Sequence, residues 1–451
     1  MSTILLKNIR CLATMDDDER ELTQAWILIR DRVIERVGMA DEAPPEDADR
    51  VIDLSRHVVL PGLVNTHHHM FQSLTRVIAQ ERELFDWLMT LYPIWSGLRG
   101  QDLYIAAKLA MAELLLSGCT TASDHHYLYP NDVQLEDEIR AAQEMGIRFH
   151  AARGSMSLGE SDGGLPPDSL VEREPQIMRD SQRLIETWHD PAPQSMLRIV
   201  VAPCSPFSVT IDMMREAAVL ARASGVQLHT HLAENDKDIA YSQERFGQTP
   251  GQYAEAVGWL GDDVWHAHCV KLNTEEARLF GRSGTGVCHC PSSNMRLASG
   301  IAPIRQMLDN SVNVGLGVDG SASNDSGHLL AEARQALLLA RALGDPAALS
   351  AREALRLATR GGAAVLGRDD IGQIMPGKSA DVIAFRLDSL AMAGAQSDPV
   401  AALVFCSPPA VDLSIINGAL VVEDGQLLTA DLPILIETHN RRSTALIRGE
   451  R

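Results

Sequence analysis

The chain has 451 residues, of which 45% are hydrophobic and 22% charged, and this ordinary globular composition excludes a protein that is disordered or fibrous throughout. Sixty acidic and 40 basic residues give a net charge of −20, which argues against nucleic-acid and anionic-membrane partners because both require basic surface. No apolar run approaches the roughly 18 residues of a membrane span. Seven scattered cysteines and a start without a secretory signal predict a reduced, cytoplasmic protein.

The two ends of the chain predict short β-strands separated by turns. Alternating and β-branched residues favour strands near the N-terminus at 3–9, 25–30, 33–37 and 50–54. Similar patterns occur at 380–386, 411–416 and 420–423, with Asn417-Gly418 as a hairpin turn. We therefore expect residues 1–57 and 368–451 to form one small domain, a β-sandwich built from both ends.

The middle of the chain, residues 58–367, alternates between strands and helices. The eight expected strands are 58–67, 119–124, 147–153, 197–202, 226–231, 264–269, 286–290 and 312–319, each followed by a helical pattern. Eight such units predict a parallel sheet closed into a (β/α)8 TIM barrel. The alternative is an open doubly wound sheet, which is disfavoured because no glycine-rich dinucleotide fingerprint follows the first strand.

Several of the 15 histidines fall where the predicted barrel strands end, which is where such barrels carry their chemistry. His67 and His69 end the first strand and face the same way, because strand side chains alternate with period two. His231 ends the fifth strand and Asp319 the eighth. Three imidazoles and one carboxylate predict a site for one divalent ion with room for water. His229 shares a face with His231, but His231 lies nearer the carboxyl end.

Two further side chains are expected at the same mouth of the barrel. Glu234 follows His231 by three residues, in the turn after the strand. His268 ends the sixth strand, closer to the mouth than His266. We therefore expect Glu234 and His268 to lie beside the predicted metal site.

Five motifs together resemble the amidohydrolase superfamily, and more narrowly its nucleobase and s-triazine deaminase branch. They are 61–70 (PGLVNTHHHM), 231–234 (HLAE), 268–269 (HC), 317–325 (GVDGSASND) and 376–381 (PGKSAD). The resemblance covers nearly the whole chain and implies a metal-dependent hydrolase that acts on C–N bonds of cyclic amidines. Binuclear members carry a carboxylated lysine on the fourth strand, and 197–203 contains none. We therefore expect one divalent metal, zinc by preference, although nitrogen and oxygen ligands also suit iron.

Within that branch, four stretches resemble the bacterial deaminases of 8-oxoguanine: 67–74, 84–95, 117–124 and 153–167. The resemblance implies hydrolysis of 8-oxoguanine to urate and ammonia. It also implies that Asp319 takes a proton from the attacking water, Glu234 protonates a ring nitrogen and His268 holds the attacking or developing oxygen. The alternatives are an s-triazine amino- or chlorohydrolase, or a guanine deaminase, on the same barrel. A non-catalytic scaffold is disfavoured, because such a protein should have lost metal ligands or proton-transfer groups. All six are present here: His67, His69, His231, Glu234, His268 and Asp319.

Contacts to the small-molecule substrate are expected from three further residues. Gln72 follows His69 by three residues and is expected to read a purine edge through its amide. Trp87 is expected to stack on a planar ring, and Arg153, at the end of the third strand, to bind a carbonyl or ring-nitrogen anion. The Gly- and Pro-rich loop 154–167 is expected to close over the substrate. A homo-oligomer is expected from the family resemblance alone.

Overall fold

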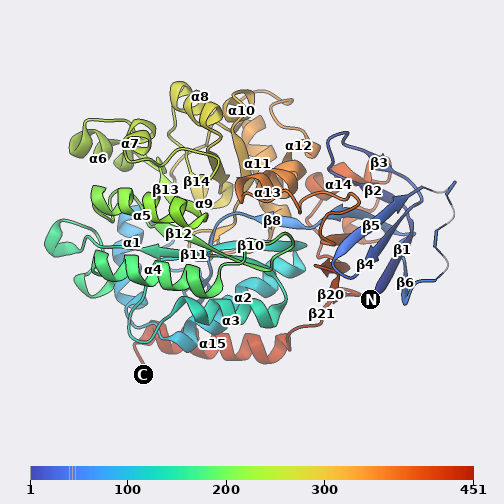
Figure 1. Cartoon of the computed structure of the whole chain (residues 1–451), viewed down its shortest axis with the longest axis horizontal. Coiled ribbons are helices and arrows are strands. Elements are labelled where there is room, and N and C mark those ends of the chain that lie inside the picture. Colours follow the sequence, from blue (N-terminus) through green and yellow to red (C-terminus); the bar gives the residue numbers. More distant parts are fainter. Residues whose placement is uncertain (1, 40, 43, 46, 451) are drawn as a thin grey trace.

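The computed structural model describes residues 2–39, 41–42, 44–45 and 47–450, and its centre is a closed barrel of eight parallel strands (Figure 1). The TIM-barrel prediction is therefore confirmed, and the pair Leu316–Asn65 closes the ring. In chain order the barrel strands are β8 (Leu63–Asn65), β10 (Cys119–His126), β11 (Arg148–Ser155), β12 (Leu197–Pro203), β13 (Gln227–Leu232), β14 (Val264–His268), β15 (Gly286–His289) and β16 (Asn313–Leu316).

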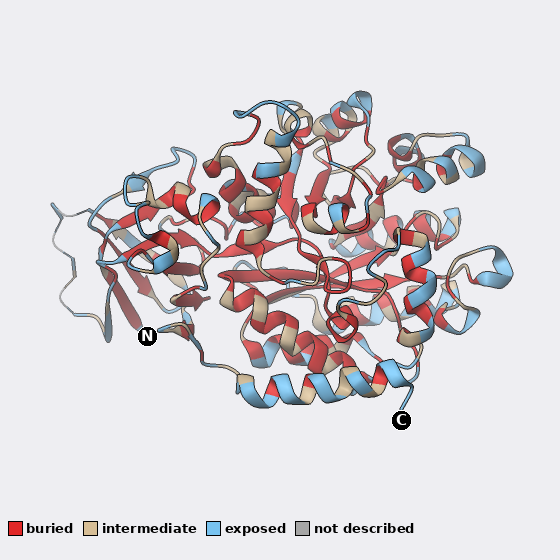
Figure 2. Cartoon of the chain, turned by 180° about the vertical axis from the view of Figure 1, so that it is seen from behind, coloured by how far each residue is buried: buried red, intermediate tan, exposed pale blue. Residues whose placement is uncertain are grey.

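Helices surround the barrel and bury the outer faces of its strands, so that β10 and β11 are buried along their whole length (Figure 2). Parallel strands buried on both faces read as nearly continuous apolar runs, as in 197–203 (LRIVVAP). The helices of this layer are α1 (Leu84–Trp95), α2 (Gly100–Leu116), α3 (Leu135–Met145), α4 (Glu174–Trp188), α5 (Ile211–Ser224), α6 (Asp236–Phe246), α7 (Pro250–Ala256), α8 (Thr274–Ser283), α9 (Pro291–Arg296), α10 (Ile304–Asp309), α11 (Leu329–Ala342), α12 (Ala351–Arg356) and α13 (Gly362–Val365).

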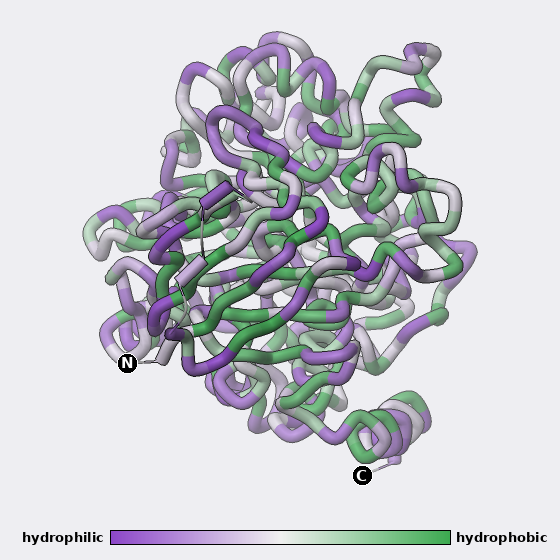
Figure 3. The backbone as a smooth tube through the Cα atoms, turned by 90° about the vertical axis from the view of Figure 1, so that its right-hand side faces the viewer, coloured by the Kyte–Doolittle hydropathy of each residue, from purple (hydrophilic) through white to green (hydrophobic). Residues whose placement is uncertain are grey.

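A smaller β-rich region, seen face on in Figure 3, combines strands from both ends of the chain. One sheet has the order β5-β4-β1-β6 and the other the order β21-β20-β19-β18-β7-β2-β3. Side chains from both sheets share one apolar core, which is why two separate ends of the sequence fold together. The strands are β1 (Thr3–Ile9), β2 (Cys11–Ala13), β3 (Glu21–Leu22), β4 (Ala25–Arg30), β5 (Val33–Gly38), β6 (Arg50–Asp53), β7 (His57–Pro61), β18 (Val382–Arg386), β19 (Leu413–Ile416), β20 (Ala419–Glu423) and β21 (Gln426–Leu427).

The structure divides the predicted first barrel strand, 58–67, between the two regions. β7 pairs with β18 in the small region, whereas β8 joins the barrel. Gly62 lies at the change of sheet, where a Cβ atom would stand 2.0 Å from Oγ1 of Thr120. The close approach of the two segments thus requires glycine where one strand leaves its sheet and the next begins.

The C-terminal tail, which the expected composite domain 368–451 includes, forms a helix. Residues Leu432–Arg448 form α15, which lies along α2 and the short helix η1 (Met70–Thr75) of the barrel (Figure 1). His439 Nε2 lies 3.0 Å from Ser73 Oγ, and Ser443 Oγ donates to the carbonyl of Leu74 at 2.6 Å. α14 (Pro399–Phe405) likewise packs on α11 and α12. The division of the chain into a composite β domain, 1–57 together with 368–451, and a barrel domain, 58–367, stays a prediction.

No helix within the described part of the chain combines the length and the apolar character that crossing a bilayer requires.

Candidate metal centre

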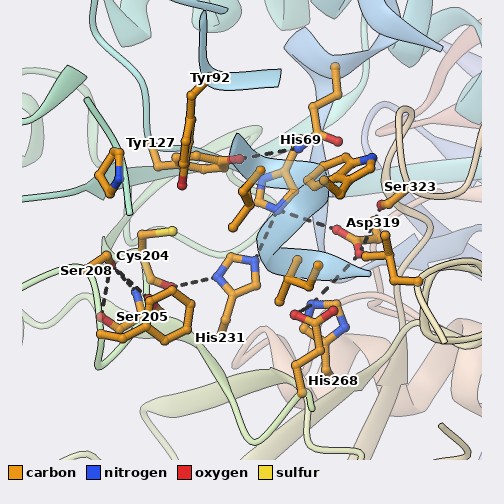
Figure 4. Close-up of a pocket in the computed structure, with 18 residues that line it drawn as sticks. His69, Tyr92, Tyr127, Cys204, Ser205, Ser208, His231, His268, Asp319 and Ser323 are labelled. Atoms are coloured by element: carbon orange, nitrogen blue, oxygen red, sulfur yellow. Dashed lines mark hydrogen bonds and ion pairs between the residues drawn. The ribbon is translucent and has the colours of Figure 1, made fainter. Parts of the chain in front are cut away.

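Four predicted ligands converge at the carboxyl ends of the barrel strands, and three of them, His69, His231 and Asp319, are labelled in Figure 4. His67 and His69 follow β8, and the pair β9 (His68–His69) and β17 (Asp319–Gly320) joins this segment to the end of the eighth barrel strand. Asp319 Oδ1 lies 3.3 Å from His67 Nε2 and 3.5 Å from His69 Nε2, and His69 Nε2 lies 3.1 Å from His231 Nε2. Three nitrogens and one carboxylate oxygen therefore face a common point.

The Nδ1 atoms of these three histidines are held by groups behind them. His69 Nδ1 donates to the carbonyl of His125 at 2.7 Å, and His231 Nδ1 donates to that of Cys204 at 2.6 Å. His67 Nδ1 lies 2.8 Å from His229 Nε2, whose other nitrogen donates to the carbonyl of Trp265 at 3.0 Å. These bonds place each ring proton on Nδ1 and leave the lone pair of each Nε2 directed at the common point, as in metal-ligating histidines.

The protonation states also suit a cation. Burial lowers the pKa values of His67, His69 and His231, which keeps these rings neutral and able to ligate. Burial acts to raise the pKa of Asp319, but the neighbouring histidines hold it well below its usual range. His67 Nε2 is buried and has no hydrogen-bond partner. The donor set therefore fits a divalent ion with nitrogen and oxygen ligands.

Glu234 and His268 lie beside this set and complete the predicted group. His268 Nε2 is 3.5 Å from Glu234 Oε2 and 3.8 Å from Asp319 Oδ2, while His268 Nδ1 donates to Asn294 Oδ1 at 2.9 Å. Burial raises the pKa of Glu234 to about 7. Burial acts to lower the pKa of His268, but the carboxylates of Glu234 and Asp319 raise it overall. The pair can therefore exchange protons near neutral pH.

The backbone is strained where these groups stand. His268 and Asp319 have φ values of 69° and 61°, in the left-handed region that non-glycine residues rarely adopt. Ala233, just before Glu234, has a φ of 53°. Left-handed conformations at the ends of three strands are typical of functional sites, where surrounding contacts hold the strain.

A pocket opens above the site and is lined by both polar and aromatic side chains. Gln72 and Trp87 line it, as expected. The Gln72 side chain has an unpartnered Oε1, and Trp87 Nε1 donates to the carbonyl of Ala322 at 3.1 Å, which fixes the indole. Pro166, from the predicted covering loop, also lines the pocket.

Arg153 requires a correction, because the structure places its side chain outside this pocket. Its guanidinium donates to Glu172 at 2.8 Å and to Asp180 at 3.1 Å, and it lies 4.0 Å from the ring centroid of Tyr129. The side chain therefore ties β11 to α4 in the outer layer. Arg153 follows the barrel strand's period-two alternation onto the helix-facing side, so it has no route to a substrate in the mouth.

Sequence reasoning missed several residues that lie at the mouth. Tyr127 and Tyr92 line the pocket together with Cys204, Ser205 and Ser208 (Figure 4). His125 belongs to a cluster with His67, His69 and His231 whose ligand atoms lie within 4.8 Å of one another. The run Asp124-His125-His126-Tyr127 at the end of β10 was a usable signal, but the expected strand stopped at residue 124.

Comparison with known proteins places the chain in a family. The amidohydrolase family model matches residues 58–421, which is most of the chain. The chain therefore belongs to the amidohydrolase family and is a hydrolase acting on C–N bonds, which confirms the resemblance drawn from the motifs.

Relatives and solved structures agree with this assignment. The chain is 48% identical to 8-oxoguanine deaminase of Pseudomonas aeruginosa over 422 residues, which cover 93% of this chain and 94% of that protein. It is 35% identical to hydroxydechloroatrazine ethylaminohydrolase of Pseudomonas sp. (strain ADP), over 94% of this chain and 92% of that one. The crystal structure of an atrazine chlorohydrolase from Arthrobacter aurescens TC1 complexed with zinc superimposes with a TM-score of 0.93 at 37% identity, covering 98% and 100% of the two chains.

Proposed function

We propose that this protein is a metal-dependent aminohydrolase that converts 8-oxoguanine and water to urate and ammonia. The reaction class is supported by the geometry of Glu234, His268 and Asp319 around the ligand set. The substrate is supported by a single observation, the 48% identity to 8-oxoguanine deaminase over almost the whole of both chains. A second candidate, hydrolysis of an s-triazine, is favoured by the high structural similarity to the zinc-bound chlorohydrolase.

His67, His69, His231 and Asp319 would hold the divalent metal, and zinc is our preferred ion. When bound, such an ion acidifies water and polarises the substrate. The Nδ1 hydrogen bonds to the carbonyls of His125 and Cys204 orient two of the rings before any ligand arrives. The protein thus contributes a pre-arranged donor set, with little reorganisation on binding.

Three side chains would move the protons of the reaction. Water attacks the ring carbon that bears the exocyclic amine, so a C–O bond forms and the C–N bond breaks. Asp319 is placed to accept a proton from the water, and Glu234, with a pKa near 7, is placed to pass a proton to the adjacent ring nitrogen. One water hydrogen ends on the leaving ammonia and the other on the ring nitrogen of urate. His268 donates a hydrogen bond to the oxygen that becomes the new carbonyl.

The base would be held by the pocket above these groups. Trp87 is proposed as a stacking surface, because its indole nitrogen is already bonded to Ala322 and the ring is fixed. Gln72 is proposed to bond the edge of the base, because its Oε1 is buried without a partner. A planar heterocycle with amide-like edges satisfies both requirements. We also propose a cytoplasmic homo-oligomer, on the family resemblance, which size-exclusion chromatography with light scattering would test.

The test compares ammonia release by the purified protein from 8-oxoguanine, guanine, isocytosine and an amino-s-triazine. We expect the largest kcat/KM for 8-oxoguanine, with urate formed in equal amount to ammonia. A triazine turned over much faster than 8-oxoguanine would replace the first proposal with the second. Elemental analysis of the active protein should find a stoichiometric divalent transition metal, and its absence would contradict the metal assignment.

A further inference from the structure

A second cluster of ligating side chains lies in the wall of the barrel, on the other face of the strand that carries His125. Asp124 and His126 are two residues apart on β10, so both face the helix layer, where they meet Glu138 of α3. All three residues are fully buried. Their ligand atoms lie within 4.8 Å of one another, and His126 Nδ1 is 3.5 Å from Glu138 Oε1. We call these three residues the wall site.

The polar atoms of the wall site are almost all without partners. Asp124 Oδ1 accepts a hydrogen bond from the backbone N–H of Met70 at 2.7 Å. Asp124 Oδ2, both carboxylate oxygens of Glu138 and both ring nitrogens of His126 are buried and have no hydrogen-bond partner. Five such atoms around one point are far outside the usual pattern, in which buried polar groups are satisfied.

Among the residues that the structure describes, no lysine or arginine pairs with the two carboxylates. Arg153 is the nearby cation that acts on His126, but its guanidinium is committed to Glu172 and Asp180 in the next layer. Two buried, unpaired carboxylates are strongly disfavoured, so the site must gain either protons or a cation. Burial accordingly raises the pKa of Asp124 to about 7 and that of Glu138 well above its usual value.

His126 distinguishes between two ways of neutralising the carboxylates of Asp124 and Glu138, by protons or by a metal ion. A proton shared between Asp124 and Glu138 would satisfy the carboxylates but would not engage His126, whose Nδ1 faces Glu138 Oε1 at 3.5 Å. Burial lowers the pKa of His126 to about 3, so the ring is neutral and cannot itself supply the missing charge. A divalent ion engages all three side chains at once, with neutral imidazole and carboxylate oxygens as its ligands.

We propose that the wall site, Asp124, His126 and Glu138, binds a second divalent transition-metal ion, distinct from the ion at the barrel mouth. Both oxygens of Glu138 are free, so this residue can supply one or two of the ligands. The absence of a strand-four lysine argues for one metal at the mouth and does not bear on this site, which lies on the opposite face of β10. The proposal does not depend on the substrate.

The wall site would also fix the ligands of the mouth. Asp124 bonds the backbone of Met70, the residue after His69, and the carbonyl of His125 accepts from His69 Nδ1. An ion bound between β10 and α3 would therefore hold the strand end that positions His69. The three wall residues act through others, so they are positioning residues for the reaction.

The deciding experiment uses the full chain without an affinity tag, stripped with a chelator, reloaded with Zn²⁺ and freed of excess metal by gel filtration. We expect two zinc ions per chain by elemental analysis. In crystals, anomalous scattering at the zinc edge should show one peak at the mouth and one between Asp124, His126 and Glu138. An anomalous peak at the barrel mouth with no anomalous density between Asp124, His126 and Glu138 would overturn the proposal, independently of the results with variants.

Variants sharpen the assignment. Glu138→Gln should bind one zinc ion fewer and keep the mouth peak, while His231→Ala should lose the mouth ion and keep the wall peak. The matched control is Glu276→Gln, a buried glutamate on α8 whose oxygens accept from the backbone N–H groups of Gly251 and Asn273. It should bind two ions. Equal zinc content in Glu138→Gln and the wild type would contradict the proposal.

Discussion

Both ends of the barrel bury charged and polar side chains, and Arg148 at one end contrasts with His67 and Gln72 at the other. At the amino-terminal end, Arg148 donates to Asp381 at 3.0 and 3.1 Å and to the carbonyls of Gln194 and Ser195, so each guanidinium nitrogen has an acceptor. At the mouth, His67 Nε2 and Gln72 Oε1 have none. Arg148 is paired within the chain and stabilises the fold, whereas the unpaired His67 Nε2 and Gln72 Oε1 lie at the proposed binding site.

The largest effect is expected from Glu234→Gln at the mouth. The amide keeps the size of the side chain but cannot move a proton, so kcat should fall by about 10²- to 10⁴-fold. Metal content and the melting temperature should stay at the wild-type values, as measured by elemental analysis and calorimetry. The exposed Glu255→Gln is the control. A kcat within threefold of the wild type would remove Glu234 from the proposed mechanism.

At the opposite end, Arg148→Ala should unfold the protein more easily without changing its chemistry. Removing one partner of a buried ion pair leaves Asp381 uncompensated and costs about 3–5 kcal/mol in the free energy of unfolding. Urea titration measures this loss, and kcat at 25 °C should remain within a few fold of wild type. Arg386→Ala, which removes the partner of Asp388 in an exposed pair, is the control and should cost under about 1 kcal/mol. A loss as small as the control's would contradict the role assigned to Arg148.

His266 is a buried group whose Nε2 donates to the carbonyl of Trp259 at 3.1 Å. Burial lowers its pKa from 6.5 to about 4 in the folded state. Between pH 6.5 and pH 4 the unfolded chain therefore binds a proton that the folded chain does not, and stability is lost as the pH falls through this window. The full loss from this residue is about 3 kcal/mol.

Urea unfolding of the wild type and of His266→Gln at several pH values between 7 and 4 measures this loss. In the variant, the free energy of unfolding should depend less steeply on pH than in the wild type, by the amount that corresponds to about one bound proton. The exposed variant Gln182→Leu serves as a control and should keep the full slope. Identical slopes in the wild type and His266→Gln would show that His266 does not titrate differently in the two states.

The smallest effect is expected from Gln72→Leu. The substitution removes the unpartnered amide oxygen, so one hydrogen bond to the base is lost and KM should rise by about tenfold, equivalent to about 1.4 kcal/mol. kcat should change less than KM, because the amide is proposed to bind the base and not to transfer a proton. Steady-state assays with Gln182→Leu as the matched surface control provide the measurement. An unchanged KM would exclude Gln72 from the substrate contacts.

The sequence predicts the parts of this protein that follow from local periodicity. His67 and His69 share a face because strands alternate, and His231, Glu234, His268 and Asp319 fall in strand ends or the turns after them. Which face of a strand points inward is harder to predict. β11 is buried along all eight residues, so its pattern could not show that Arg153 faces the helices. The same ambiguity hides the wall site, where Asp124 and His126 face opposite to His125.

Long-range contacts were equally invisible in the sequence. The local sequence does not show that β7 pairs with β18 outside the barrel and that the barrel strand begins only after Gly62. The apolar run 58–64 continues across this glycine without interruption. α15 could be found as an amphipathic helix, but its place against η1 depends on contacts across 366 residues, such as that between Ser73 and His439. Such docking is set by the shape and polarity of the assembled barrel, which a window of sequence does not contain.

The path of the chain has a consequence for how this enzyme is made. His67 and His69 are synthesised early, yet the strand that leads into them pairs with β18, and the helix that follows them is bonded to α15. Domains usually fold from the N-terminal side as the ribosome releases the chain. Here the contacts that support these two proposed ligands emerge last. We therefore expect the proposed metal centre to be completed only when synthesis is nearly finished, and a nascent chain stalled before β18 to carry the histidines without the site.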